Sequence, residues 1–295
     1  MIPRTIDQIV PLVSERKLAV ILGVPLSALR ELAALGDSLY RSYDLPKKRG
    51  AGIRKINDPR DRLKVVQRRI YVRLLQLIPL PPFILGGVPG KSVRDNAEPH
   101  VRAPWLVKVD IKRFFPSVNA RNVSNVWLRY FRTGRNTTAV LTRLTTFSGQ
   151  LPQGAPTSTP LANLVLAPVL DEFQIYLSQR GLALTDWVDD ITFSGSSAPD
   201  AINRLADILS QHGFRIARSK TQAMHAGGHQ ETTGVVTNRK LSVGRNRKRR
   251  LRDTMRAING RKENAREKGL IAHTLSISRS QGNRLKELVA KRRDA

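Results

Sequence analysis

LALTDWVDDITFSG, residues 182–195, is the stretch that decides the fold of this chain. Its apolar residues flank a polar centre, a pattern that predicts two short strands joined in a hairpin at Asp189–Asp190. Two adjacent carboxylates repel each other, and a turn requires only one Asp. A second apolar run, APWLVKVDI at 103–111, also contains an acid near its end, Asp110. Carboxylates clustered at the ends of apolar strands indicate a compensating cation.

The three Asp residues suit a pair of magnesium ions. Magnesium prefers hard oxygen ligands and usually takes one or two carboxylates. A two-metal site would activate a 3′- or 2′-hydroxyl and stabilise a leaving pyrophosphate. The spacing alone leaves an alternative open, because many Asp–Asp pairs are surface turns or helix caps.

The charge of the chain predicts a polyanionic partner. Its 295 residues include 51 Lys+Arg and 23 Asp+Glu, which gives a net charge of +28. Such an excess attracts nucleic acid and releases counterions when phosphates are neutralised. A merely basic surface or a membrane-surface protein is the alternative, but no long basic amphipathic stretch favours lipid, so we expect no membrane partner.

The absence of cysteine and of a targeting signal limits the chemistry and the location expected of the protein. The chain has no cysteine, which excludes disulfides, thiolate zinc sites and cysteine nucleophiles. The N-terminal stretch is too charged for a secretory signal, and no run of 18 apolar residues occurs. We therefore expect a cytoplasmic protein.

The pattern along the chain predicts an α+β fold. We expect short helices in 6–36, a basic turn in 45–58 and amphipathic helices at 60–78 and 201–213. Strands mixed with helices in this way are typical of an antiparallel sheet backed by helices. Residues 239–295 hold 19 basic and 5 acidic residues, half of the net charge, and predict a small basic helical domain. A disordered basic tail is the alternative there.

Four segments, taken in order, resemble the motifs of reverse transcriptases. VKVDIKRFFPSV (107–118) resembles the first catalytic motif, and GQLPQGAPTSTPLANL (149–164) resembles the motif that positions template and nucleotide. WVDDITFSG (187–195) is similar to the tyrosine-x-Asp-Asp motif, and GFRIARSKTQ (213–222) to the motif that carries a lysine after a helix. The resemblance covers about residues 43–240. It implies a right-hand polymerase fold with fingers, palm and a short basic helical thumb.

Two further segments resemble signatures of bacterial retron reverse transcriptases. Asn96-Ala97-Glu98-Pro99-His100 is similar to their Asn-Ala-x-x-His signature, and ETTGVVTN (231–238) to their Val-Thr-Gly motif. The short basic segment after the palm also favours this class over group II intron enzymes, which normally carry longer extensions. The implied division is N-terminal helices and fingers at 1–100, palm at 101–238 with a fingers segment around 120–155, and thumb at 239–295.

The resemblance implies roles for individual residues. Asp110, Asp189 and Asp190 match the catalytic metal ligands for two Mg²⁺ ions, with Mn²⁺ as a substitute, and the backbone carbonyl of Ile111 matches a further metal contact. Phe115 matches the ring that favours dNTPs over NTPs. The full set of implied nucleotide-binding residues is Lys47, Lys48, Arg54, Phe115, Gln153, Gly154 and Lys220. The candidates for RNA binding are Asn96, His100, Thr233, Gly234, Arg247, Lys248, Arg249 and Arg250.

Simpler interpretations stand beside some of these roles. Phe114 is best explained as a core residue, and Lys220 is equally well explained as a surface lysine. His100 has an alternative as a hydrogen-bonded structural histidine, and we do not assign it as an acid or base.

The chain departs from the family pattern in three places. Trp187 replaces the usual tyrosine and Val188 the common alanine; the proline of TSTPLANL comes one residue late; and Thr232 stands where the signature has valine. Trp187 puts primer-end positioning in doubt, but no departure removes a metal ligand.

The implied function is that of a bacterial retron reverse transcriptase. Such an enzyme binds its own structured noncoding RNA and copies part of it, from an internal guanosine 2′-hydroxyl, into single-stranded DNA (msDNA) that stays attached. Its implied partners are this RNA and DNA, dNTPs and an effector protein encoded nearby, in antiphage defence. The alternatives are another bacterial reverse transcriptase (group II intron, diversity-generating or defence-associated) and a catalytically silent RNA-binding scaffold.

Overall fold

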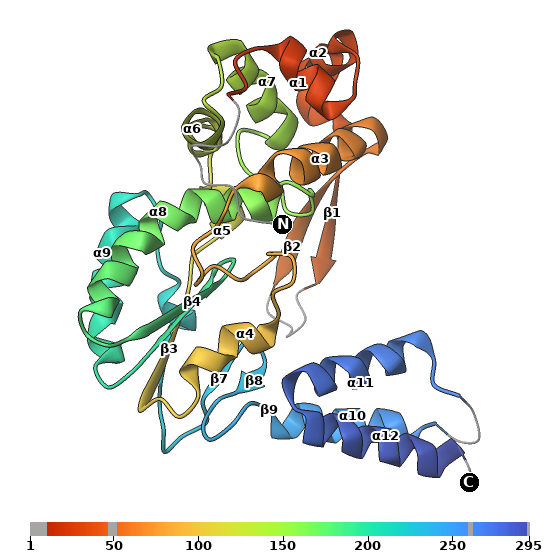
Figure 1. The fold of residues 1–295 in the computed structure, drawn as a ribbon, viewed down its shortest axis with the longest axis vertical. Coiled ribbons are helices and arrows are strands. Elements are labelled where there is room, and N and C mark those ends of the chain that lie inside the picture. The colour runs from red at the N-terminus through yellow and green to blue at the C-terminus, as the bar shows by residue number, and fades with distance from the viewer. Residues whose placement is uncertain (1–10, 47–51, 259–261, 294–295) are drawn as a thin grey trace. The chain divides into compact units, whose positions relative to one another are not determined.

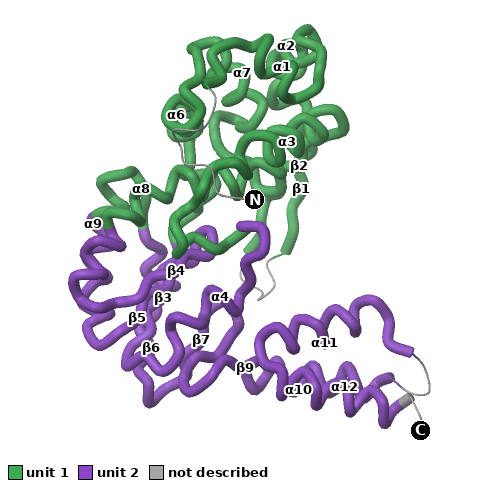
Figure 2. Tube along the Cα trace, in the orientation of Figure 1, with its two compact units in different colours: residues 1–87, 111–172, 208–215 green, residues 88–110, 173–207, 216–295 purple. Residues whose placement is uncertain are grey.

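The computed structural model describes residues 11–46, 52–258 and 262–293, and the chain forms two compact units (Figure 2). Unit 1 contains residues 1–87, 111–172 and 208–215, and unit 2 contains residues 88–110, 173–207 and 216–295. The polypeptide passes between the units several times, so each unit is built from segments that are distant in sequence.

Unit 1 consists of helices around one hairpin (Figure 1). Its elements are α1 (Glu15–Leu22), α2 (Leu26–Leu35), η2 (Gly36–Leu39), β1 (Tyr40–Pro46), β2 (Ile53–Pro59), α3 (Asp61–Arg73), η3 (Leu75–Leu77), α5 (Phe114–Ser117), α6 (Ala120–Phe131), α7 (Arg135–Thr145) and the first part of α8 (Ser158–Ser178). The amphipathic helix predicted at 60–78 is thus α3 followed by a 3-10 turn. It buries Leu63, Val66 and Ile70 and leaves its cationic residues at the surface or part-buried.

The first two helices are short and sharply bent relative to each other. Ser14 caps α1 by accepting a hydrogen bond from Lys17 N, and Gly23 ends it in the left-handed region at φ 63°. Among the described residues no single helix is long and apolar enough to cross a bilayer. Helix α1 and residues 26–39 meet that test only together, and they are bent by 99°.

Unit 2 is centred on a four-stranded antiparallel sheet in the order β4-β5-β3-β6. The elements of this part are α4 (Val93–Ala97), η4 (Glu98–His100), β3 (Trp105–Asp110), β4 (Ala183–Trp187), β5 (Asp190–Ser194), η5 (Ala198–Asp200), most of α9 (Ala201–Gln211), η6 (Arg218–Lys220) and β6 (Gln222–His225). Side chains alternate across the sheet, so Val107, Val109 and Phe193 share one apolar face. Phe173 of α8 packs edge-on against Phe193, with ring centroids 5.2 Å apart.

The rest of unit 2 is a small sheet followed by three helices. The strands are β7 (Glu231–Thr232), β8 (Val235–Val236) and β9 (Ser242–Val243), and the helices are α10 (Arg245–Arg256), α11 (Ala265–Ile277) and α12 (Arg279–Arg293). One apolar cluster joins them and includes Leu251, Met255, Ile271 and Leu285. Ala97 of α4 belongs to the same cluster, so the helices pack on the segment that precedes β3. The C-terminal segment is therefore helical, as predicted.

Candidate active site

The three predicted catalytic carboxylates lie at one end of the unit 2 sheet. Asp110 ends β3 and is directly opposite Asp190, which begins β5. Trp187 pairs with Asp190, so Val188 and Asp189 form the turn of the β4–β5 hairpin. Val188 adopts φ 71°, an unusual conformation for a β-branched residue, and Asp189 N donates to Trp187 O at 3.0 Å. Strand register and this strained turn therefore bring the carboxylates together.

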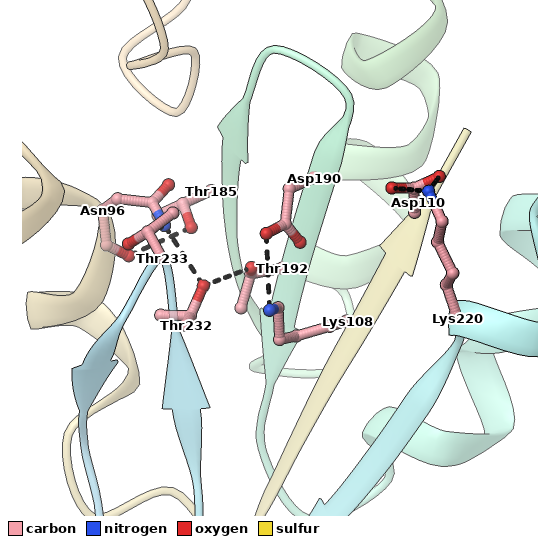
Figure 3. A network of polar contacts seen from close by, with 9 residues as sticks. All are labelled: Asn96, Lys108, Asp110, Thr185, Asp190, Thr192, Lys220, Thr232 and Thr233. Carbon is pink, nitrogen blue, oxygen red and sulfur yellow. Dashed lines mark hydrogen bonds and ion pairs between the residues drawn. The ribbon is translucent and has the colours of Figure 1, made fainter. Parts of the chain in front are cut away.

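Two lysines compensate the carboxylates (Figure 3). Lys220 Nζ donates to both carboxylate oxygens of Asp110 at 2.8 Å. Lys108 Nζ lies 3.4 Å from Asp190 Oδ2. Sequence reasoning had not assigned a role to Lys108. The signal was present, because Lys108 precedes Asp110 by two residues in a strand and therefore shares its face.

The two lysines leave part of the negative charge of the site uncompensated. Burial, together with the charges of Asp110 and Asp190, raises the pKa of Asp189 to about 6. Burial also raises the pKa of Asp190, although Lys108 works against this. Bringing these groups together without a cation therefore disfavours their ionised forms.

Asp186, in β4, is a fourth acid that the sequence reasoning passed over. It is completely buried, and neither carboxylate oxygen has a hydrogen-bond partner among the described residues. Burial raises its pKa well above the usual range, and the charges of Asp189 and Asp190 add to that shift. Burial and the neighbouring charges therefore disfavour the ionised form of this carboxyl.

The residues present fit a hard divalent cation. Three carboxylates at one sheet end supply the oxygen ligands that magnesium prefers, and a bound cation would relieve the repulsion that raises the pKa of Asp189. Across residues 11–46, 52–258 and 262–293 no three His, Asp or Glu side chains are arranged as a ready-made metal cluster. Lys220 and Lys108 engage Asp110 and Asp190 instead.

The predicted nucleotide-positioning residues of unit 1 are joined to the β1–β2 hairpin. Gln153 O accepts a hydrogen bond from Asn57 N at 2.8 Å. Gly154 adopts φ 114°, and a Cβ there would lie 2.9 Å from Ile56 Cγ2. Only glycine suits such a close approach. Arg54 is exposed on β2, and Lys47 and Lys48 lie outside the described residues.

The phenylalanine pair separates into a core residue and a half-buried one. Phe114 is 2% exposed and packs against Phe214, with ring centroids 5.8 Å apart, which confirms its interpretation as a core residue. Phe115 is half-buried at the start of α5. The side chain of Ile111 is buried, and the metal contact of its carbonyl stays a prediction.

Comparison with known proteins identifies the family. The model of the reverse transcriptase (RNA-dependent DNA polymerase) family matches residues 45–263. Retron Mx65 reverse transcriptase of Myxococcus xanthus is 33% identical over 302 residues, covering 92% of this chain and 70% of the relative. Retron Ec86 reverse transcriptase of Escherichia coli is 30% identical over 277 residues, covering 91% and 86% respectively. The chain belongs to the retron reverse transcriptases.

Solved structures agree on the fold. Telomerase from Candida albicans with a fragment of telomeric RNA aligns with a TM-score of 0.54 at 10% identity, over 85% of this chain and 55% of that one. Apo telomerase from Candida tropicalis gives 0.52 at 10% identity, over 86% and 58%. This chain spans little more than half of those chains, and the likeness shows the fold alone. The predicted right-hand α+β polymerase fold is thereby confirmed, and the family match with the retron relatives confirms the RNA-directed DNA polymerase class.

The retron signature residues Asn96 and His100 lie inside the molecule. Both side chains are fully buried. Thr185 Oγ1 donates to Asn96 O at 3.1 Å and lies 2.8 Å from His100 Nε2, while His100 Nδ1 lies 2.7 Å from Ser194 Oγ. Because the Thr185 hydroxyl proton is already used, Nε2 carries the proton and Nδ1 accepts from Ser194. Burial lowers the pKa of His100 to about 4, so the ring is neutral.

This placement gives the two residues a structural role. Both side chains are enclosed in this structure, and RNA binding by these two candidates stays a prediction. Asn96 Nδ2 instead donates to Thr232 Oγ1 at 3.3 Å and Thr233 Oγ1 at 3.4 Å. In this retron reverse transcriptase Asn96 therefore joins α4 to the β7–β8 turn, and His100 joins η4 to β4 and β5. His100 is the hydrogen-bonded structural histidine of the alternative interpretation.

The second retron signature forms a tight hairpin turn. Thr232 pairs with Val235, and Thr233 and Gly234 between them adopt φ 48° and 81°. Positive φ at both positions is typical of a type I′ turn. The hydroxyl of Thr232, which replaces the family's valine, is buried and lies 2.8 Å from Thr192 Oγ1 (Figure 3). The departure is thus accommodated by a polar partner on β5.

The predicted basic RNA-binding run occupies the first turns of α10. Arg249 and Arg250 are exposed, whereas Arg247 and Lys248 are half-buried. Arg247 faces the signature turn, since a Cβ added at Gly234 would lie 3.2 Å from its Nη1. The run therefore divides into side chains with different surroundings, and RNA contact by each of them stays a prediction.

Proposed function

We propose that this retron reverse transcriptase copies part of its own structured noncoding RNA into single-stranded DNA, primed from an internal guanosine 2′-hydroxyl. The observation that carries the proposal is the register of Asp110 opposite Asp190, with Asp189 in the intervening turn, in a chain related to retron enzymes over most of its length. The proposed cellular setting is antiphage defence in the bacterial cytoplasm, together with an effector protein.

In the proposed reaction, Asp110, Asp189, Asp190 and the Ile111 carbonyl hold two divalent ions, Mg²⁺ or in its place Mn²⁺. When bound, such ions favour the ionised attacking hydroxyl and stabilise the leaving pyrophosphate. Asp189, whose pKa is raised to about 6, is half protonated near pH 6, so its ionised form is favoured by a bound cation or by a pH well above 6. The carboxylates therefore supply both the ligands and the charge that draws the cations in.

Lys220 is proposed to exchange partners during the reaction. Its side chain is 61% exposed and its ammonium is bound to Asp110. With Asp110 engaged as a metal ligand, the Lys220 ammonium would be free to stabilise charge on the leaving pyrophosphate. Lys108 stays with Asp190 and limits its movement.

The unit 1 residues are proposed to position the dNTP. Arg54, with Lys47 and Lys48, would bind the triphosphate through charge-assisted hydrogen bonds. The Gln153–Gly154 turn, which is joined to β2 through Asn57 N, presents backbone to the nucleotide. Phe115 would exclude a 2′-hydroxyl, so Phe115→Ala is expected to raise NTP incorporation. If NTP use does not rise in that variant, Phe115 has no part in sugar selection.

Primer extension on an RNA template tests the catalytic assignment. Asp110→Asn, Asp189→Asn and Asp190→Asn keep the side-chain shape and remove the charge, and each should reduce DNA synthesis by 100-fold or more. Ser196→Ala, at an exposed position outside the site, is the matched control for handling and folding. Full synthesis by Asp190→Asn would contradict its role as a metal ligand, whereas absence of synthesis by the wild type would favour the silent-scaffold alternative.

A further inference from the structure

The three C-terminal helices enclose a cationic hollow that no part of the proposed reaction uses. We call it the thumb pocket. It has a volume of about 500 Å³ and lies among β9, α10, α11 and α12. Its basic side chains come from two helices that are far apart in sequence: Arg245, Lys248, Arg252 and Arg256 of α10, and Arg284 of α12.

The charges of the thumb pocket are uncompensated. Within the described part of the chain, none of its five basic side chains forms an ion pair or a hydrogen bond with a carboxylate. The four on α10 follow a spacing of three or four residues, so they are neighbours on one helix face. Like charges at this spacing destabilise a helix. The four cations of α10 repel one another and lie around the same pocket as Arg284. A bound anion would relieve this repulsion.

The interior of the thumb pocket is apolar. Leu251, Leu285 and Leu288 line it between the basic side chains. Long arginine stems can cover leucines simply to shield them from water, and this structural role predicts no ligand. A cavity of this size with an apolar lining and a few polar groups is also typical of pockets for small organic groups. A nucleotide combines the two chemistries, with an anionic phosphate and a flat apolar base.

One polar side chain in the pocket is free to recognise such a group. Gln281 Oε1 accepts a hydrogen bond from Val243 N at 2.8 Å, which fixes the amide, and its Nε2 donates to no described group. Gly282 allows this arrangement, because a Cβ there would lie 2.8 Å from Leu275 Cα of α11. The start of α12 is therefore held close to α11, with a fixed amide donor at the pocket.

We propose that the thumb pocket binds one unpaired nucleotide of the cognate RNA. The five cations hold its phosphate and the phosphates beside it, the leucines receive the base, and Gln281 Nε2 donates to the base edge. Structured RNAs are recognised mainly through unpaired bases in loops and bulges, which a paired product does not offer. This inference rests on the proposed function insofar as that function supplies a structured RNA partner.

Binding of matched hairpins tests the proposal on the full-length protein. The probes are an RNA hairpin with one bulged nucleotide, the same hairpin fully paired, and the DNA version of each, measured by fluorescence anisotropy. The wild type should prefer the bulged RNA over the paired RNA by about fivefold or more, the effect of about 1 kcal/mol for one inserted base. Equal preference for bulged DNA would overturn the assignment to RNA.

Charge-matched variants separate the pocket from the general basic surface. Arg252→Gln/Arg256→Gln should abolish the preference for the bulge, and Arg284→Gln should do the same from a different helix. Arg249→Gln/Arg250→Gln removes the same charge from exposed positions of α10 outside the pocket, and should weaken both hairpins by the same factor. If both double variants keep the preference, or the wild type has none, the pocket does not bind a nucleotide.

Two further measurements distinguish a failure of the pocket proposal from unfolding of a variant and from a failure of the proposed function. Circular dichroism of each variant shows whether the helices remain folded, and the exposed double variant provides the reference. Extension of a DNA primer on an RNA template is measured with the wild type. Absence of extension would contradict the proposed polymerase function, whereas the bulge preference would still test the thumb pocket.

Discussion

The neutral, buried His100 predicts a specific loss of stability in acid. Its pKa is lowered to about 4 by burial, whereas an unfolded histidine titrates near 6.5. Between these values the unfolded chain binds more protons than the folded chain. The contribution of His100 to stability is therefore complete above about pH 6.5 and falls as the pH drops toward 4. From pH 7.5 to pH 5 the free energy of opening should fall by about 2 kcal/mol on account of this residue alone.

The contacts of His100 supply a conservative variant. Nε2 donates to Thr185 Oγ1 and Nδ1 accepts from Ser194, so a glutamine amide can replace both contacts without titrating. His100→Gln should therefore retain the fold and lose the acid sensitivity. The exposed His229, replaced by glutamine in the same way, is the matched control and should leave the pH dependence as it is in the wild type.

The assay must isolate the sheet of unit 2 from the rest of the chain. Amide hydrogen exchange of peptides covering 182–195, read by mass spectrometry in EDTA, reports the free energy of opening of β4 and β5. Asp189 works in the opposite direction, because its pKa is raised to about 6 and its protonation favours the folded state as the pH falls. The quantity to compare is thus the difference between wild type and His100→Gln at each pH. A difference that stays constant from pH 7.5 to pH 5 would refute the reasoning.

Three other predictions concern the carboxylates and a glycine. Asp186→Asn should stabilise the β4–β5 hairpin in EDTA, and the stabilisation should grow as the pH rises from 4. The raised pKa of Asp186 makes the contribution of this residue to stability decline with rising pH. A stabilisation that shrinks as the pH rises would contradict this. Adding Mg²⁺ should raise the melting temperature more at pH 7.5 than at pH 5, where Asp189 is protonated, and Asp189→Asn should remove most of that difference. Gly154→Ala should raise the KM for dNTPs and reduce stability by about 1–3 kcal/mol, since its Cβ would meet Ile56 at φ 114°. Gly269→Ala in α11, where a Cβ meets no atom within 4 Å, is the control and should be neutral or stabilising.

The catalytic carboxylates were predictable because short-range patterns determine them. The period of two in a strand and the polar centre of 182–195 placed Asp110, Asp189 and Asp190 at strand ends, and the order of the motifs supplied their pairing. The turn itself is one residue earlier than predicted, at Val188–Asp189, because Asp190 pairs with Trp187. Lys108 could have been found by the same period.

Burial of polar side chains was not predictable from the local sequence. His100 finds its partners 85 and 94 residues away, and Asn96 finds Thr232 136 residues away. A signature of polar residues in a basic chain suggests a binding surface, and only the fold shows that these two are enclosed. The thumb pocket was not predictable for the same reason, since Arg284 joins the row of basic side chains on α10 only through the packing of α12.

The nucleic acid that copurifies with the protein tests the central claim most directly. The chain is expressed with its native flanking DNA, and the bound nucleic acid is treated with RNase, DNase and a 2′,5′-debranching enzyme and then sequenced. The account predicts a discrete single-stranded DNA whose mobility changes on debranching and which is absent from the Asp190→Asn variant. RNA alone, or heterogeneous DNA without a branch, would contradict synthesis from an internal 2′-hydroxyl of the enzyme's own RNA.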